Sequence, residues 1–332
     1  MIAQSKPLVA IMIGDPAGIG PEVIAKAIAT GLPHAVSRPV LVGHAPAMEW
    51  AVEISGVDLV VRRIEHVDDA GLDPSVIDII DDGDLEPGSY RLGEASAACG
   101  NASFAWLDRL DQMARSGQVA ATIMAPINAD SLRLSNQRRP VFSIEQGSTY
   151  LTLLSGPLRI VHLTDHEPLR AVPELITRDA VVQAIEVIHE RFSAWGVTDP
   201  SIAVSGFNAH AKGREEADRI APAVEEAAAR GIDVVGPISP DTVFRHCIDG
   251  RNDVVLAMYH DQGHIAVKTW GFVGNCAMIL GLPYLQFSVG HGTAFDIVGQ
   301  NLARHEMILS AMTEAASLAA GRGFRPVGPT PA

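Results

Sequence analysis

Short apolar runs of strand length alternate with helical patterns along most of this chain. One run covers 8–13 and leads through a glycine-rich turn to a helical pattern at about 23–30; later runs at 119–124 and 254–258 also end in polar residues. Runs that are apolar throughout suit strands buried on both faces of a parallel sheet. Because such strands alternate with helices, the pattern predicts an α/β fold with a mainly parallel sheet.

The length of the chain predicts more than one folding unit. Its 332 residues exceed what one compact domain usually holds. We therefore expect two lobes, the first made of residues 1–130 and 285–332 and the second of residues 131–284.

Composition narrows the classes of function. The formal net charge of −14 is a poor match for a phosphate backbone, so we expect no nucleic-acid partner. A small anionic substrate stays open, because a local basic pocket can exist on an acidic protein. Cys99, Cys247 and Cys276 are far apart and form no CxxC pair, which argues against a disulfide framework or a structural zinc cluster.

The same features predict the compartment. The apolar run near the N-terminus is too short for a membrane span and lacks the basic and apolar regions of a signal peptide. No other segment approaches the roughly 20 apolar residues that crossing a bilayer needs. With few cysteines as well, we expect a cytoplasmic protein that does not contact membranes.

The stretch 253–268, DVVLAMYHDQGHIAVK, begins as a buried strand and ends in residues with chemistry. His260 and Asp261 follow the apolar run, and His264 and Lys268 come soon after. In open α/β sheets, ligands bind beyond the carboxyl ends of the strands. We therefore expect the catalytic site here. Lys268, predicted on an extended segment, would clamp an anionic substrate group or would simply be solvated.

Three histidines each follow a predicted strand. His166, His210 and His260 would meet at one edge of the sheet, where imidazoles can bind zinc, cobalt, nickel or iron and leave a position open to polarise a substrate oxygen. Each could equally be an ordinary hydrogen-bonding loop residue. The neighbours Asp165, Asn208 and Asp261 could fix the imidazole tautomers, and Asp241 and Asp261 are alternative acid–base groups.

Two glycine-containing segments predict a nucleotide site. The turn at 14–22, GDPAGIGPE, lets the backbone approach a ligand, although it is neither GxGxxG nor a Walker motif and many such turns are only connections. The loop at 290–297 has two glycines and Asp296, which can accept hydrogen bonds from a ribose or an adenine. The basic stretch at 131–147 reads as a solvated surface loop.

Six motifs together resemble the 4-hydroxythreonine-4-phosphate dehydrogenase family of pyridoxal phosphate biosynthesis. They are GDPAGIGPE, APIN, GFNAHA, SPDT, YHDQGHIAVK and SVGHGTAFDI, in the family's order and over nearly the whole chain. The first and last also resemble segments of isopropylmalate and isocitrate dehydrogenases. The resemblance implies a homodimer of two-lobed α/β/α subunits with the active site at the subunit interface. The implied chemistry is NAD-dependent oxidation of a secondary alcohol with metal-assisted loss of a neighbouring carboxylate; NADP is the alternative cofactor.

Carried onto this chain, the resemblance implies specific site residues. The metal ligands would be His166, His210 and His260, holding Zn, Mg, Mn or Co. Asp241, Asp261 and Lys268 would serve catalysis. The remaining roles are substrate binding by Ser148, Thr149, Asn208 and Lys268, and cofactor binding by His291, Gly292, Thr293, Ala294, Asp296 and Asn301.

The chain departs from the family pattern at positions that bind the substrate and its phosphate group. The substrate-binding histidine is replaced by Ser148, and the lysine after Pro-Ile-Asn by Ala129. The phosphate-binding asparagine and arginine fall on Ala277 and Gln286, and loss of the arginine removes a bidentate phosphate donor. Gly290 gives SVGHG, which is similar to the relatives that dehydrogenate cis-dihydrodiol carboxylates, such as the terephthalate dihydrodiol enzyme.

From these departures we expect an unphosphorylated hydroxy or diol carboxylate as the substrate. The alternative is 4-hydroxythreonine 4-phosphate, or threonate or erythronate 4-phosphate, with Arg138 or Arg139 replacing the lost phosphate clamp. Alternatives of another class are a metal-dependent lyase or hydrolase and a non-catalytic metabolite-binding protein.

Overall fold

The computed structural model describes residues 6–86, 88–139, 141, 147–271 and 273–325. Contacts between residues divide the chain into two compact units. Unit one contains Met1–Ser143 and Pro283–Ala320, and unit two contains Ile144–Leu282 and Gly321–Ala332. That the lobes at 1–130 with 285–332 and at 131–284 are the folding units stays a prediction.

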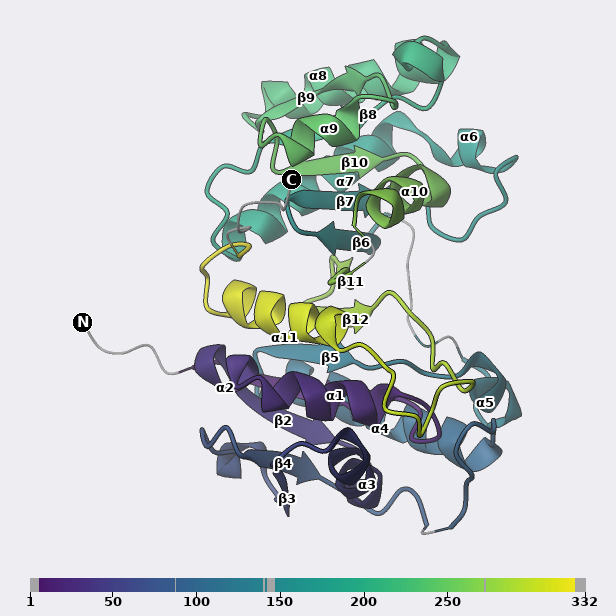
Figure 1. The fold of residues 1–332 in the computed structure, drawn as a ribbon. Helices are drawn as coiled ribbons and strands as arrows, with labels where there is room; N and C mark the ends of the chain where they lie inside the picture. The colour runs from purple at the N-terminus through teal and green to yellow at the C-terminus, as the bar shows by residue number, and fades with distance from the viewer. Residues whose placement is uncertain (1–5, 87, 140, 142–146, 272, 326–332) are drawn as a thin grey trace, which may run out of the picture. The chain divides into compact units, whose positions relative to one another are not determined.

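Unit one is built on a sheet whose paired strands are all parallel, in the order β3-β4-β2-β1-β5-β12. Its strands are β1 (Leu8–Met12), β2 (Arg38–Val42), β3 (Val60–Arg63), β4 (Val76–Ile80), β5 (Ala121–Met124) and β12 (Leu285–Val289). Its helices are α1 (Gly20–Ala29), α2 (Leu32–Val36), α3 (Ala45–Ser55), the 3₁₀ turn η1 (Val67–Asp69), α4 (Ala97–Arg115), α5 (Ala129–Leu134) and α11 (Glu306–Ala319). Helices α1, α2 and α11 lie together in front of this sheet, and α4 packs against β1 and β5 from behind (Figure 1).

Unit two has a mixed sheet in the order β11-β6-β7-β10-β8-β9, in which β6 runs antiparallel to both of its neighbours. The strands are β6 (Tyr150–Ser155), β7 (Leu158–His162), β8 (Ile202–Ser205), β9 (Val234–Ile238), β10 (Val254–Ala257) and β11 (Cys276–Leu280). The helices are α6 (Val172–Leu175), α7 (Arg178–Ala194), the 3₁₀ turn η2 (Ala209–Ala211), the π-helical turn η3 (Glu216–Ile220), α8 (Ala221–Ala229), α9 (Val243–Ile248) and α10 (His260–Trp270).

The core of unit two has two parts. One cluster packs α7 and α8 against β10 and its neighbours, with Phe192, Ile188 and Leu256 fully buried. The other includes Ile160 of β7 and Val267 of α10. The parallel α/β fold predicted from the alternating runs is confirmed, because the buried strand centres are the apolar runs of the sequence.

The extended segment predicted around Lys268 is wrong, since the segment is helix α10. Gly263 and Val267 are the buried positions of this helix, four residues apart, which is the spacing of one helical face. The helix packs against β6 and β7. Strands β6 and β12 lie in segments where the sequence pattern predicts no strand.

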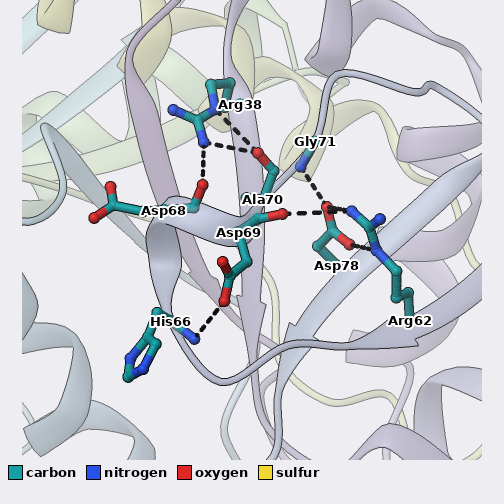
Figure 2. Close-up of polar contacts among 8 residues, drawn as sticks. All are labelled: Arg38, Arg62, His66, Asp68, Asp69, Ala70, Gly71 and Asp78. Carbon is teal, nitrogen blue, oxygen red and sulfur yellow. Dashed lines mark hydrogen bonds and ion pairs between the residues drawn. The ribbon is translucent and has the colours of Figure 1, made fainter.

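A polar cluster holds one edge of the unit-one sheet (Figure 2). Asp78 is buried inside β4, and its carboxylate accepts two hydrogen bonds from Arg62, at 2.6 and 2.9 Å, and one from the amide of Gly71 at 2.7 Å. Arg38 donates to the carbonyl of Ala70 at 2.7 Å. Because a buried carboxylate is costly unless paired, these contacts let an acidic residue occupy a strand interior.

Among the described residues, no helix is long and apolar enough to cross a membrane.

Candidate functional site

Four histidines gather at the carboxyl ends of two neighbouring parallel strands in unit two. His162 is the last residue of β7 and pairs in register with Ala257 of β10. His166 follows β7, and His260 and His264 lie on the first turns of α10, directly after β10. The ring centroids of His166 and His260 are 4.7 Å apart, and those of His260 and His264 are 3.6 Å apart.

Two of the predicted metal histidines are brought together with a carboxylate. Asp165, His166 and His260 each offer one ligand atom, and these atoms all lie within 4.8 Å of one another. The His166 side chain is exposed, whereas the Asp165 side chain is only 16% exposed. Imidazole and carboxylate groups at this spacing fit a divalent cation such as Zn, Co or Mn.

The tautomer of His260 suits a ligand. Its Nδ1 lies 2.7 Å from Oδ1 of Asp261, and this hydrogen bond holds the pKa of Asp261 below its usual value. With Nδ1–H donating to the carboxylate, Nε2 keeps a free lone pair. A carboxylate behind a ligating histidine orients the ring and raises its basicity.

His162, which no sequence motif singles out, and His264, which lies in the expected catalytic stretch, both lie beside His260. The ring of His264 stacks on that of His260 at 16° between planes, and its Nδ1 lies 3.1 Å from the carbonyl of His260. His162 is fully buried 4.9 Å from His264, with Nδ1 at 2.9 Å from the carbonyl of Leu151. Its Nε2 faces Gly263. The only local signal was the spacing of four residues between His260 and His264.

Burial keeps both supporting rings neutral. Loss of water contact lowers the pKa of His162 to about 3. Burial, followed by the charge of the neighbouring His260, lowers the pKa of His264 to about 4. Neutral rings beside a cation site do not repel the ion.

We expect His162 to make the stability of the metal-stripped protein fall in mild acid. Its pKa is about 6.5 in the unfolded chain and about 3 in the folded protein, so between these values the unfolded state binds more protons. Stability is therefore fully present above about pH 6.5 and falls as the pH decreases towards 3. For this one group the loss amounts to about 2 kcal/mol between about pH 7.5 and pH 5.

Urea unfolding of wild type and His162→Asn at the two pH values measures this contribution. Asparagine keeps a donor near the Leu151 carbonyl but does not titrate, so its loss of stability should be smaller by about that amount. Equal losses in the two proteins would show that His162 is not buried in the neutral form.

His210 lies apart from this donor group. It is exposed on η2, with φ of 56°, and Ala211 follows with φ of 52°. Such left-handed conformations cost non-glycine residues about 1 kcal/mol or more. Buried Glu216 holds the loop by accepting from the amides of Phe207 and Asn208, each at 2.7 Å. Among the described residues, His210 is not in the group of ligand atoms within 4.8 Å.

The loop of His210 is nevertheless tied to the turn that carries His260. Gln262 accepts from the amide of Met258 at 2.7 Å and donates through Nε2 to the carbonyl of Gly206 at 2.9 Å. Asn208 itself donates to Glu215 and Glu216, both at 2.8 Å. The side chain of Asn208 is therefore committed to the loop in this structure.

The substrate and catalytic residues predicted in unit two differ in burial. Buried Thr149 lines a cavity of about 180 Å³ together with His162, Asp165 and His166. Ser148, beside it in the sequence, is exposed. Lys268 is exposed in the last turn of α10, and exposed Asp241 accepts a 2.6 Å hydrogen bond from the hydroxyl of Ser239.

In unit one, the predicted cofactor loop packs on the glycine-rich turn. The carbonyl of Thr293 accepts from the amide of Ile19 at 3.0 Å, and its hydroxyl accepts from Asn128 Nδ2 at 3.2 Å. A side chain at Gly18 would meet Thr293 at 2.8 Å. Further along, the carbonyl of Asn301 accepts from Lys26 of α1. Two segments about 270 residues apart therefore form one surface of backbone groups.

The other predicted cofactor residues lie on the same loop. Nδ1 of His291 is 2.9 Å from the carbonyl of Gly292, and the carbonyl of Asp296 accepts from Gln300. Ala294 has a positive φ of 43°. A loop held in this way after a parallel strand is where α/β proteins bind ligands.

Comparisons with known proteins agree with this architecture. The family model described as "Pyridoxal phosphate biosynthetic protein PdxA" matches residues 35–315. A relative from Novosphingobium aromaticivorans, assigned as a 4-hydroxythreonine-4-phosphate dehydrogenase, is 54% identical over 96% of this chain and 97% of its own.

Two solved structures are also similar. The 4-hydroxythreonine-4-phosphate dehydrogenase from Burkholderia phymatum matches with a TM-score of 0.84 and 33% identity, over 97% of this chain and all of its own. The terephthalate 1,2-cis-dihydrodiol dehydrogenase from Burkholderia xenovorans LB400 matches with a TM-score of 0.68 and 32% identity, over 94% and 98% of the two chains. The chain therefore belongs to the PdxA family of dehydrogenases.

Proposed function

We propose that this chain is an NAD-dependent, divalent-metal-dependent dehydrogenase that oxidises the secondary alcohol of a four-carbon hydroxy acid 4-phosphate, of the 4-hydroxythreonine 4-phosphate or threonate 4-phosphate type. The observation that carries the proposal is the group of ligand atoms from Asp165, His166 and His260. The relative that is 54% identical over nearly the full length supports the phosphorylated substrate.

The residues of unit two would divide the work. When bound, a divalent ion such as Zn, Mg, Mn or Co polarises the substrate oxygen, which also favours decarboxylation of the oxidised product. Asp261 orients His260, and Thr149 is placed to bind substrate in the same cavity as His166. Lys268 supplies a cationic group for the anionic part of the substrate, with Asp241 as an acid–base group.

We also propose a homodimer whose active site lies at the subunit interface. The support is that His210 is exposed, outside the donor group of its own chain, and held in a strained loop. A strained backbone that the surroundings maintain indicates a functional position. His210 would then complete the ligand set of a second copy.

Arginines in unit one are candidates for binding the phosphate group of the substrate. Arg133, Arg138 and Arg139 line a cavity of about 460 Å³ that Phe104 also lines. Arg138 donates through Nη1 to the carbonyls of Ser135 and Gln137, and Arg139 donates through Nη2 to Asp108. Guanidinium groups bind phosphate well, so a cavity of this kind supports the alternative clamp.

An unphosphorylated diol carboxylate is the second candidate substrate. Ala277 is buried within β11 and Gln286 lies on β12, so neither position offers a phosphate the charged donor that an arginine would. The similar terephthalate dihydrodiol dehydrogenase structure supports this candidate.

A screen for NAD reduction by the metal-loaded protein tests the proposal. One set of substrates contains 4-hydroxythreonine, threonate and erythronate 4-phosphates, and the other contains dihydrodiol carboxylates and unphosphorylated hydroxy acids. We expect kcat/KM of roughly 10⁴ M⁻¹s⁻¹ or more for a member of the first set. Turnover confined to the second set would replace the phosphorylated substrate with a diol carboxylate. No turnover in either set would contradict the dehydrogenase assignment for these substrates.

We expect Gly18→Ala to weaken NAD binding. The new Cβ would lie 2.8 Å from Cβ and 2.9 Å from the carbonyl oxygen of Thr293, so the cofactor loop must move away from the turn. Overpacking of this kind costs about 1–3 kcal/mol, which corresponds to roughly a tenfold rise in KM for NAD. Titration of NAD in steady-state assays measures it, with thermal melting to verify folding. A KM within twofold of wild type would contradict the placement of NAD on this loop.

A further inference from the structure

We propose that Asp165 is a metal ligand, so that this chain presents a two-histidine, one-carboxylate donor set made of Asp165, His166 and His260. The inference rests on the metal dependence of the proposed function. It goes beyond that function because the expected ligands are the three histidines, with Asp165 only an outer partner that orients a ring.

The geometry between Asp165 and His166 favours ligation. Oδ1 of Asp165 lies 2.9 Å from Nδ1 of His166, yet this oxygen has no hydrogen-bond partner among the described residues. Two atoms on adjacent corners of an octahedron around an ion at about 2.1 Å lie roughly 3.0 Å apart, and on a tetrahedron about 3.4 Å apart. The pair therefore has the separation of two ligands of one ion and lacks the alignment of a hydrogen bond.

Burial of the carboxylate points the same way. The Asp165 side chain is 16% exposed, and Oδ1 itself is out of contact with water. Neighbouring polar groups are engaged elsewhere: the hydroxyl of Thr164 donates to the carbonyl of Met258 at 2.9 Å, and the amide of Glu167 donates to the backbone carbonyl of Asp165 at 2.7 Å. A buried carboxylate oxygen without a donor is costly, and a bound cation removes that cost.

The local fold directs the three groups to one point. The turn after β7 carries Asp165 and His166, and the first turn of α10 carries His260. Asp261 fixes the tautomer of His260 so that Nε2 is unprotonated. All three donors come from unit two of a single chain, and the proposed His210 of a second copy would add to this set.

A carboxylate in the ligand set changes which ions fit. Oxygen donors favour harder cations such as Mn²⁺ and Mg²⁺, whereas an all-imidazole set favours zinc. We therefore expect the loss of Asp165 to weaken Mn²⁺ binding more than Zn²⁺ binding.

Calorimetric titration of the metal-stripped, full-length protein with Mn²⁺ and Zn²⁺ tests the proposal without an activity assay. The variants are Asp165→Ala, Asp165→Asn, His260→Ala and, as a charge-matched control, Glu174→Ala on the exposed side of α6. We expect Asp165→Ala to weaken Mn²⁺ binding at least tenfold and more than Zn²⁺ binding. Glu174→Ala should stay within twofold of wild type. The absorption spectrum of bound Co²⁺ should change in Asp165→Asn, which keeps the size of the side chain.

The outcomes separate the two proposals. Mn²⁺ affinities of both Asp165 variants within twofold of wild type, together with a loss of binding in His260→Ala, would overturn the assignment of Asp165 and leave the metal-dependent function standing. Absence of Mn²⁺, Zn²⁺ and Co²⁺ binding by the wild-type protein would overturn the metal-dependent function itself.

Discussion

His260→Ala should abolish stoichiometric metal binding and lower kcat/KM for NAD reduction by roughly 1,000-fold or more, because charge stabilisation by a bound metal amounts to several kcal/mol and each 1.36 kcal/mol is a factor of ten. His260 is the central ring of the group: it lies 4.7 Å from His166, stacks on His264 at 3.6 Å, and is oriented by Asp261 at 2.7 Å. Replacing His260 with alanine removes the imidazole that would bind the metal and with it the contacts to His166, His264 and Asp261.

Metal content by elemental analysis and steady-state kinetics measure the two losses. The control is His246→Ala on α9, which removes a partly exposed histidine of the same unit and should change neither quantity more than twofold. Chelation of the wild-type enzyme should reproduce the kinetic loss, and added Mn²⁺ or Zn²⁺ should reverse it. Undiminished turnover by His260→Ala would place the chemistry elsewhere in the protein.

Gly263→Ala should cost about 3 kcal/mol of folding stability, although alanine is the better helix former by about 1 kcal/mol. A Cβ at this position would lie 2.3 Å from Nε2 of His162 and 2.7 Å from Cγ2 of Ile160. Both neighbours are fully buried on β7, so they cannot swing away and α10 must shift instead. A shift of α10 moves His260, and we expect metal affinity to fall at least tenfold as well.

Urea unfolding followed by circular dichroism gives the change in stability, and calorimetry gives the metal affinity. Gly292→Ala is the matched control for stability, since no atom lies within 4 Å of its added Cβ; it should stay within about 0.5 kcal/mol of wild type. A loss below 1 kcal/mol for Gly263→Ala would mean that α10 adapts to the extra methyl group without strain.

The two predictions depend on α10, which is also where sequence reasoning was weakest. The polar residues after the strand predict no helix by an apolar pattern of their own, and the sequence analysis expects an extended segment at Lys268. The residues that α10 buries against β7 are Gly263 and Val267. Because glycine has no apolar side chain, this buried face does not show as a helical pattern of apolar residues in the sequence.

His162 was missed for a related reason. Its place at the end of the apolar run of β7 marks it as a strand residue and not as part of a site. The parallel pairing of β7 with β10, which sets His162 opposite Ala257, brings its ring to within 6.1 Å of that of His260, whereas His264 lies beside His260 because the two are four residues apart on α10. His210 follows β8 as the pattern predicted, but among the described residues it is not in the donor group of its own chain.

The parallel α/β class, the strand ends that carry the site and the family can all be predicted from the sequence, because apolar runs and short motifs are local properties of the chain. Which side chains meet could be seen only once the chain was folded. The approach of His166 to His260, the contact of His162 with His264 and the packing of Thr293 on Gly18 depend on strand register and helix packing between distant segments. Those are set by the fit of many buried side chains at once, which no single stretch of sequence encodes.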